Sequence, residues 1–365
     1  MIEPRVDPWV DPATDAAVDG AGAASLPAAD QALHAAVTGP PGPAQRRAVA
    51  KTITLLESTR PEHRVRADAL LNALLNALLS RSGHAFRLGI SGVPGVGKST
   101  FIEALGMHLI GLGHRVAVLA VDPSSSISGG SILGDKTRME RLAMDERAYI
   151  RPSPASGTLG GVAEKTREAI RVCEAAGFDV VIVETVGVGQ SEIAVAGMTD
   201  MFVLLQLPNA GDDLQAIKKG VMEIADLVVI NKADLDVDAA TRARAQISSS
   251  LRIIGMHRNP EHLPHDATVW HPQVMQLSAL KGSGLLEFWS SVSQFQTLQT
   301  ANGRLAERRH AQDQAWMDAL IAAGLQQRFK AHAAVRSTWP QFSAEVRAGR
   351  MAASVAARRL LDLFH

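Results

Sequence analysis

The sequence predicts an α/β fold in which helices cover both faces of a mainly parallel sheet, giving three layers. Over residues 85–290, short apolar runs alternate with segments of helical pattern, and the runs are apolar at consecutive positions. Strands of this kind are typical of parallel sheets buried between two layers of helices. Polar motifs follow several of the runs, at the strand ends where open α/β sheets bind their ligands. The predicted strands are residues 86–90, 116–121, 180–183, 201–207, 227–230 and 274–277.

The composition restricts the class of protein. The chain has 365 residues, and its 37 Lys and Arg residues are balanced by 37 Asp and Glu residues. A net charge of zero provides no general attraction for nucleic acid or for an anionic membrane, so we expect neither as a partner. No run reaches the roughly 18 consecutive apolar residues of a membrane helix. Cys173 is the only cysteine, which excludes an internal disulfide and favours a reducing compartment. We expect its side chain to be buried in a helix core.

The first 40 residues are rich in Ala, Gly, Pro and Asp, a composition that buries too little apolar surface to become ordered. We therefore expect a flexible extension over residues 1–40. Its acidic residues argue against a mitochondrial targeting peptide, and it lacks the hydrophobic core of a secretory signal. The sequence thus predicts a cytoplasmic protein.

Residues 41–84 have a helical pattern with an apolar stripe. Such a stripe predicts packing on the α/β domain that follows, and contact with a second copy of the chain is the alternative. The leucines of the stripe are Leu70, Leu71, Leu74, Leu75, Leu78 and Leu79.

A glycine-rich motif joins the first predicted strand to a helix, with the spacing of a phosphate-binding P-loop. Glycine allows turns in which successive backbone N–H groups point at phosphates, assisted by the positive end of the following helix. We expect Lys98 to contact the β- and γ-phosphates and the Ser99 hydroxyl to hold Mg²⁺. The motif consists of Gly92, Val93, Pro94, Gly95, Val96, Gly97, Lys98, Ser99 and Thr100.

Two further motifs indicate that the base is guanine. Asn231, Lys232 and Asp234 follow the strand at 227–230, and Ser278, Ala279 and Leu280 follow the strand at 274–277. A carboxylate at Asp234 can accept hydrogen bonds from both N1–H and the amino group of guanine, whereas adenine would leave it unpaired. We expect Asn231 to brace the neighbouring loops, Lys232 to lie along the base, and the Ala279 N–H to reach the guanine oxygen.

Three acidic residues are candidates for the Mg²⁺ site. Asp122 and Glu184 lie at the ends of predicted strands, and Asp135 lies in a glycine-rich loop, where a helix cap is the alternative. Mg²⁺ takes octahedral oxygen ligands and keeps several waters, so we expect some of these residues to act through water.

The segment from Glu184 to Gly187 stands where many GTPases have Asp-x-x-Gly, and small GTPases place a water-orienting glutamine directly after that glycine. Here that residue is Val188, which cannot orient water. Gln190 lies two residues further on and is the candidate substitute, with a helix N-terminal contact as the alternative. We therefore expect slow intrinsic GTP hydrolysis that a partner accelerates.

A third candidate switch covers residues 211–220, which begin with acidic residues and carry lysines that could approach developing phosphate charge. An ordinary helix start, with Asp212 as its N-cap, is an equal alternative. Residues 291–365 then read as helices with apolar positions that need a packing partner, either the α/β domain or a second copy of the chain.

Taken together, these motifs resemble the methylmalonyl-CoA mutase-associated GTPases of the MeaB/ArgK type. The resemblance covers roughly residues 46–365 and rests on GVPGVGKST, VDPSSSISGGSILGDKTRM, ETVGVGQSE, AGDDLQAIKKG, NKAD and SALKGSG. It implies a homodimeric GTPase chaperone of an adenosylcobalamin-dependent acyl-CoA mutase, which uses GTP or GDP with Mg²⁺. The P-loop GTPase domain would span residues 85–290, between N-terminal helices at 41–84 and a dimerisation arm at 291–365.

Residue by residue, the resemblance assigns the Mg²⁺ region to Ser99, Asp122, Asp135 and Glu184. It assigns coupling to the partner to Asp212, Asp213, Gln215 and Lys218. Candidate catalytic residues on this interpretation are Lys98, Glu184, Gln190 and Lys218.

Three other interpretations compete with a mutase chaperone. A kinase would need a second acceptor site, and the guanine motif argues against ATP as its donor. A nickel metallochaperone GTPase would use Cys and His ligands near its switches, whereas Cys173 stands alone. A non-enzymatic interaction protein is disfavoured because Lys98 and Ser99 are both present.

Overall fold

The computed structural model describes residues 26–58, 60–81, 85–121, 139–152, 159–185, 191–208, 219–258 and 269–364. The chain divides into two compact units, residues 1–86 with 97–191 and residues 87–96 with 192–365. Seven strands follow the order β3-β2-β4-β1-β5-β6-β7 in one sheet, and every pair of known register is parallel. The α/β class expected from the sequence is therefore confirmed.

In the first unit, the buried strand β2 (Val116–Val121) pairs with β3 (Ala148–Arg151) and with β4 (Val180–Thr185). The register sets Val116 opposite both Ala148 and Val180. The strand β3 was not predicted from the sequence, because its four residues offer only three consecutive buried positions between polar neighbours.

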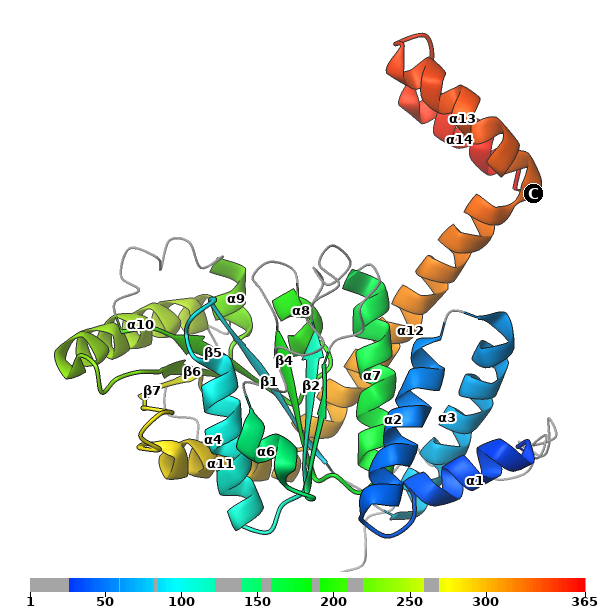
Figure 1. Ribbon diagram of the computed structural model, residues 1–365. Helices are drawn as coiled ribbons and strands as arrows, with labels where there is room; N and C mark the ends of the chain where they lie inside the picture. Colours follow the sequence, from blue (N-terminus) through cyan, green and yellow to red (C-terminus); the bar gives the residue numbers. More distant parts are fainter. Residues whose placement is uncertain are drawn as a thin grey trace, which may run out of the picture. The chain divides into compact units, whose positions relative to one another are not determined.

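Helices surround these strands in the first unit. Figure 1 shows α2 and α3 alongside α7, and these helices pack on one another. The helices are α1 (Ala28–Val37), α2 (Pro43–Glu57), α3 (Pro61–Arg81), α4 (Lys98–Gly111), α6 (Glu140–Met144) and α7 (Leu159–Ala175).

The expectation of a flexible extension through residue 40 is wrong for residues 28–37, which form α1. This helix packs on α2 and α3 and buries Val37 and Asp30. The Asp30 carboxylate accepts two hydrogen bonds from the Arg66 guanidinium, at 2.7 and 3.0 Å. Composition alone could not reveal this anchor, because Arg66 lies 36 residues further along the chain.

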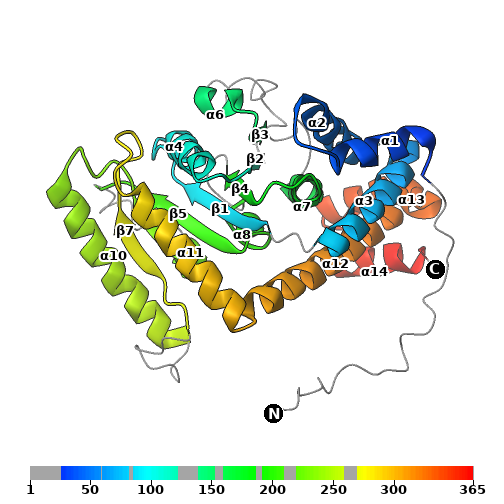
Figure 2. The same ribbon diagram turned by 90° about the horizontal axis from the view of Figure 1, so that it is seen from below.

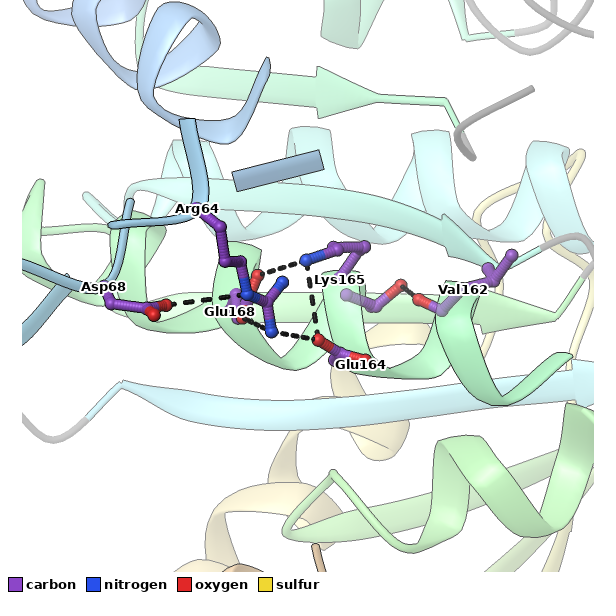
Figure 3. Close-up of polar contacts among 7 residues, drawn as sticks. Arg64, Asp68, Val162, Glu164, Lys165 and Glu168 are labelled. Atoms are coloured by element: carbon purple, nitrogen blue, oxygen red, sulfur yellow. Dashed lines mark hydrogen bonds and ion pairs between the residues drawn. The ribbon is translucent and has the colours of Figure 1, made fainter. Parts of the chain in front are cut away.

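Polar side chains tie the N-terminal helices to the rest of the first unit. Arg115, which directly precedes β2, donates to Gln45 of α2 at 2.8 Å, and Gln45 donates to the carbonyl of Ala176 at 2.8 Å. In Figure 3, Arg64 of α3 reaches Glu164 of α7 at 2.6 Å. The first unit is thus cross-linked by polar contacts as well as by its apolar core.

The second unit holds four parallel strands: β1 (Phe86–Gly92), β5 (Met201–Gln206), β6 (Leu227–Ile230) and β7 (Gln273–Gln276). The residues of β1, β5 and β6 are all buried, as the consecutive apolar runs predicted. Short helices α8 (Ser191–Ala196) and α9 (Lys219–Ile224) precede β5 and β6. Figure 2 shows β7 between α10 (Val237–Arg258) and α11 (Leu285–Ala301).

The chain continues into α12 (Arg304–Ala331), α13 (Ala333–Arg347) and α14 (Ala353–Asp362). Figure 1 shows α13 and α14 paired at the far end of α12. No residue of α12 is buried, although the helix is 28 residues long. Among the helices that the structure describes, none is both long and apolar enough to cross a membrane.

Candidate functional site

The loop between β1 and α4 depends on glycine at the positions that the motif predicted. Gly92, Gly95 and Gly97 have φ angles of 156°, 81° and 93°, in the region that side chains with a Cβ rarely adopt. At Gly92 a Cβ would also lie 2.6 Å from the carbonyl oxygen of Leu205, inside van der Waals contact. The loop can therefore take this path only with glycine at these positions.

Lys98 and Ser99 open α4, a helix of 14 residues with no acidic side chain in its first turn. Both are half-buried. The first N–H groups of a helix have no partner within the helix, and the helix dipole places partial positive charge there. This end of α4 is therefore suited to an anion such as a phosphate.

Asn231 joins two loops of the second unit. It follows β6, and its side-chain Nδ2 donates to the carbonyl of Val96 at 2.8 Å. Its Oδ1 accepts a hydrogen bond from the backbone N–H of Ala279 at 3.1 Å. The side chain is buried, with only 2 % of the residue exposed. Asn231 thus braces the neighbouring loops, as the sequence led us to expect.

Lys232 is the only non-glycine residue of the described chain with a positive φ, 60°. This conformation accompanies a hydrogen bond from Nζ to the carbonyl of Gly95 at 2.8 Å. The lysine therefore reaches from the end of β6 to the glycine-rich loop, and the residue is half-buried.

Asp234 lies beside the loop that follows β7. The Ser278 hydroxyl donates a hydrogen bond to its carboxylate, and Lys281 Nζ lies 3.5 Å from Oδ2. The Ser278 hydrogen bond, opposed by partial burial and assisted by Lys281, holds the pKa of Asp234 below its ordinary value. The carboxylate is thus ionised and can accept hydrogen bonds.

The other residues of this motif differ in exposure. Ser278 and Ala279 are buried, whereas Leu280 is 81 % exposed. The Ser278 N–H donates to the carbonyl of Ser283 at 3.0 Å, which closes the turn. The Ala279 N–H, which we expected to reach the guanine oxygen, donates instead to Asn231 Oδ1 in this structure. The exposed apolar side chain of Leu280 is a surface that a flat heterocycle could contact.

Glu184 lies at the carboxyl end of β4 and is 2 % exposed. In the parallel register it stands opposite Ala120, and Thr185 stands opposite Val121, the last residue of β2. The Ser99 hydroxyl and the Glu184 carboxylate are hard oxygen donors, the type that Mg²⁺ prefers, so they fit that ion.

Several residues predicted from the sequence lie outside the described residues: Asp122, Asp135, Gln190, Asp212, Asp213, Gln215 and Lys218. Within the described ranges, no three His, Cys, Asp or Glu side chains gather as a metal site. Cys173 is buried as expected, and burial raises the pKa of its thiol, so it is unreactive.

Three contacts of the site were not predicted from the sequence: Lys281 beside Asp234, and the carbonyls of Gly95 and Val96 as acceptors. The Asn231 contact with Val96 spans 135 positions of the chain, and the contact with Ala279 spans 48. No local pattern encodes which backbone carbonyl an amide will reach. The only signal available was that both motifs follow strands of one predicted sheet.

Comparison with known proteins identifies relatives over most of the chain. A family model described as methylmalonyl Co-A mutase-associated GTPase MeaB matches residues 49–334. A probable GTPase of Mycobacterium tuberculosis is 51 % identical over 319 residues, which cover 87 % of this chain and 91 % of that protein. The mouse protein named methylmalonic aciduria type A homolog, mitochondrial, is 48 % identical over 327 residues, which cover 88 % of this chain and 77 % of that protein.

GTPase ArgK of Escherichia coli is 50 % identical over 274 residues, which cover 75 % of this chain and 79 % of that protein. Among solved structures, that of a protein named LAO/AO transport system kinase superposes with a TM-score of 0.68 at 36 % identity. That match covers 91 % of this chain and 96 % of the other. The similarity therefore extends over most of the length of both chains.

Proposed function

Because the chain belongs to the family of methylmalonyl-CoA mutase-associated GTPases, we propose that it is the chaperone of an adenosylcobalamin-dependent acyl-CoA mutase. It is a P-loop GTPase. In the proposed role, GTP binding and hydrolysis gate the loading of adenosylcobalamin and protect the mutase from inactivation. The partner is methylmalonyl-CoA mutase or a related acyl-CoA mutase, and the description of the matching family, which names that mutase, supports this choice.

The proposal that the base is guanine rests on the hydrogen bonds that Asn231 makes to two loops. This amide holds the glycine-rich loop and the Ala279 loop together, with Asp234 ionised beside them. Two carboxylate oxygens match the two adjacent N–H donors of guanine, and adenine has no such pair. Leaving a polar group without its partner gives strong discrimination, which supports GTP over ATP as the substrate.

In the proposed reaction, water attacks the γ-phosphorus in line, the bond to the β–γ bridging oxygen breaks, and GDP and inorganic phosphate result. The N–H groups of the loop at 92–97 and the Lys98 ammonium stabilise the negative charge. Ser99 and Glu184 would hold Mg²⁺, which when bound neutralises charge on the phosphate oxygens. Gln190 and Lys218 remain candidates for orienting water and for partner-stimulated hydrolysis.

We also propose that the chain forms a homodimer through its C-terminal helices. On α12, Met317, Ile321 and Leu325 are 49 %, 52 % and 53 % exposed at a spacing of four residues, which aligns them on one face. An unpartnered apolar stripe on a long helix without buried residues is typical of an interaction surface.

The paired helices α13 and α14 offer a site for this stripe. Together with the end of α12 they form a cavity of about 490 Å³, lined by Phe329, Trp339, Phe342, Val346, Leu360 and Leu361. Basic side chains dominate this part of the chain, whereas Asp313 and Asp318 flank the stripe. In a two-fold dimer, the stripe of one copy would enter the cavity of the other, with opposite charges around it.

Titration calorimetry with GTP, GDP, ATP and ADP tests the proposed nucleotide, and capture from native extract with a non-hydrolysable GTP analogue tests the partner. We expect guanine nucleotides alone to bind and a cobalamin-dependent mutase to co-elute. Lys98→Ala should abolish both the binding of guanine nucleotides and the co-elution of the mutase.

The name of the solved relative, a transport system kinase, suggests phosphoryl transfer to an acceptor as the alternative. ATP binding as tight as GTP binding, or a phosphorylated acceptor, would favour that alternative.

A further inference from the structure

Lys281 is close to the carboxylate that is proposed to read the base. Its Nζ lies 3.5 Å from Oδ2 of Asp234, which is 14 % exposed at its side chain, whereas the lysine side chain is 64 % exposed. The lysine can therefore move into solvent without disturbing the packing of the loop. The aspartate is largely fixed.

The turn after β7 holds the lysine in this position. The Lys281 N–H donates to Ser278 Oγ at 3.3 Å, and the Ser278 hydroxyl in turn donates to Asp234. Gly282, which follows, has a φ of 72°, so the chain reverses directly after Lys281. The backbone of this turn thus places the Lys281 ammonium group at the edge of the proposed base site.

An ammonium group at Oδ2 competes with a base for the same oxygen. Guanine has two donors, N1–H and the 2-amino group, and needs both carboxylate oxygens. Hypoxanthine lacks the 2-amino group and needs only one of them. With N1–H on Oδ1, hypoxanthine leaves Oδ2 to the lysine, whereas guanine brings its 2-amino group to the same oxygen and so weakens the ion pair.

We propose that Lys281 is a specificity-determining residue of the base site: it is the internal partner of Asp234, displaced by guanine and retained beside hypoxanthine. This inference rests on the proposed guanine site. The lysine therefore lowers the ratio by which the site prefers guanine to hypoxanthine, because only guanine brings a donor to the oxygen with which the lysine is paired. An ion pair this exposed is expected to change binding by about two- to fivefold.

The test measures dissociation constants for GDP and inosine diphosphate with wild-type protein, Lys281→Met and Lys281→Arg. In Lys281→Met, we expect the ratio of the IDP constant to the GDP constant to rise about two- to fivefold at low salt. High salt should bring the wild-type ratio toward that of the variant, because salt screens the exposed pair. Lys281→Arg should keep the wild-type ratio, because it keeps the positive charge.

Lys51→Met is the matched control, since Lys51 is exposed on α2 and its loss changes the net charge equally. It should leave the ratio unchanged. An unchanged or lower ratio in Lys281→Met, with GDP still bound, would overturn the role of Lys281. Wild-type protein that does not prefer GDP to ADP would instead refute the proposed guanine site, on which this role depends.

Discussion

At the scale of single residues, Asn231 shows why an amide is needed at the junction of two loops. Its side chain donates to Val96 and accepts from Ala279, and both partners are backbone groups. An aspartate cannot donate, and an apolar side chain would leave a buried carbonyl and a buried N–H without partners. A single side chain thus fixes the distance between the loops that are proposed to hold phosphates and base.

Asn231→Ala should weaken GDP binding at least tenfold and lower the free energy of unfolding. Each buried group left unpaired costs about 1–3 kcal/mol, and 1.4 kcal/mol is a factor of ten in binding. Calorimetry and urea denaturation measure the two effects. Asn76→Ala is the control, because Asn76 is exposed on α3. GDP affinity equal to that of the control would mean that the brace does not position the site.

At the scale of elements, the first turns of α12 are fastened to the amino ends of the sheet strands. Asp200, which precedes β5, is fully buried and accepts two hydrogen bonds from Arg309 at 2.7 and 2.6 Å. It also accepts the backbone N–H of Arg87 in β1 at 2.8 Å. Arg308 makes a similar but more exposed contact with Asp226, at 3.1 Å. These contacts orient α12, and with it the helices that follow.

The two arginines should differ in their contribution to stability. Arg309→Met leaves a buried carboxylate without its cation, which we expect to lower the free energy of unfolding by about 3–5 kcal/mol. Arg308→Met exposes Asp226 to water, so the loss should be about 1 kcal/mol or less. Urea denaturation compares the pair directly. Equal losses in the two variants would show that burial of Asp200 does not govern the effect.

Another polar cluster joins α3 to α7, and Figure 3 shows its members pointing toward one another. Glu168 is its most buried residue, with a side chain 6 % exposed, 3.2 Å from Lys165 and 3.9 Å from Arg64. Burial raises the pKa of Glu168 above its ordinary value of 4.5 in spite of these cations. The ionised form is therefore less favourable in the folded chain than in the unfolded chain.

The raised pKa predicts the sign of a pH effect. The folded state holds the Glu168 proton more tightly, so this residue's contribution to stability decreases as pH rises from about 4.5 through the raised pKa. Glu168→Gln should match wild-type stability at acidic pH and exceed it at neutral pH, in urea denaturation at several pH values.

Asp30→Asn provides the opposite control. The hydrogen bonds from Arg66 lower the pKa of Asp30, so its stabilisation is complete above about 3.8 and is lost as pH falls through the lowered value. This variant should be less stable than wild type at neutral pH. If the stability difference from wild type changed with pH in the same direction in Glu168→Gln and Asp30→Asn, the opposite pKa shifts of Glu168 and Asp30 would be contradicted.

At the scale of the whole molecule, the exposed stripe of α12 is the surface through which the chain is proposed to form a homodimer. Ile321→Asp places a charge in the middle of the stripe and should convert the proposed dimer into a monomer. Ala323→Asp adds the same charge to the same helix, on the opposite face, and should leave the dimer intact. Sedimentation velocity measures the outcome. A dimer that persists in Ile321→Asp would exclude this face as the interface.

Local patterns in the sequence were enough to predict the class of fold, six of the seven strands of the sheet and the glycine positions of the phosphate loop. Strand burial repeats along consecutive residues, and positive φ at Gly92 or Gly97 restricts the residue type directly. The polar motifs after the strands could be predicted as well, because parallel strands bring their carboxyl ends to one edge.

The specific pairs of side chains and backbone groups that contact one another, at that edge and in the rest of the fold, became known only from the tertiary structure. Folding pairs Asn231 with Val96 and Ala279, Lys281 with Asp234, and Asp30 with Arg66, which orders a helix where composition predicted none. It also adds β3, whose three buried residues lie between polar neighbours and become a recognisable strand only when paired with β2. Such contacts join residues far apart in the chain, and their energy arises from burial and hydrogen bonding that exist only after folding.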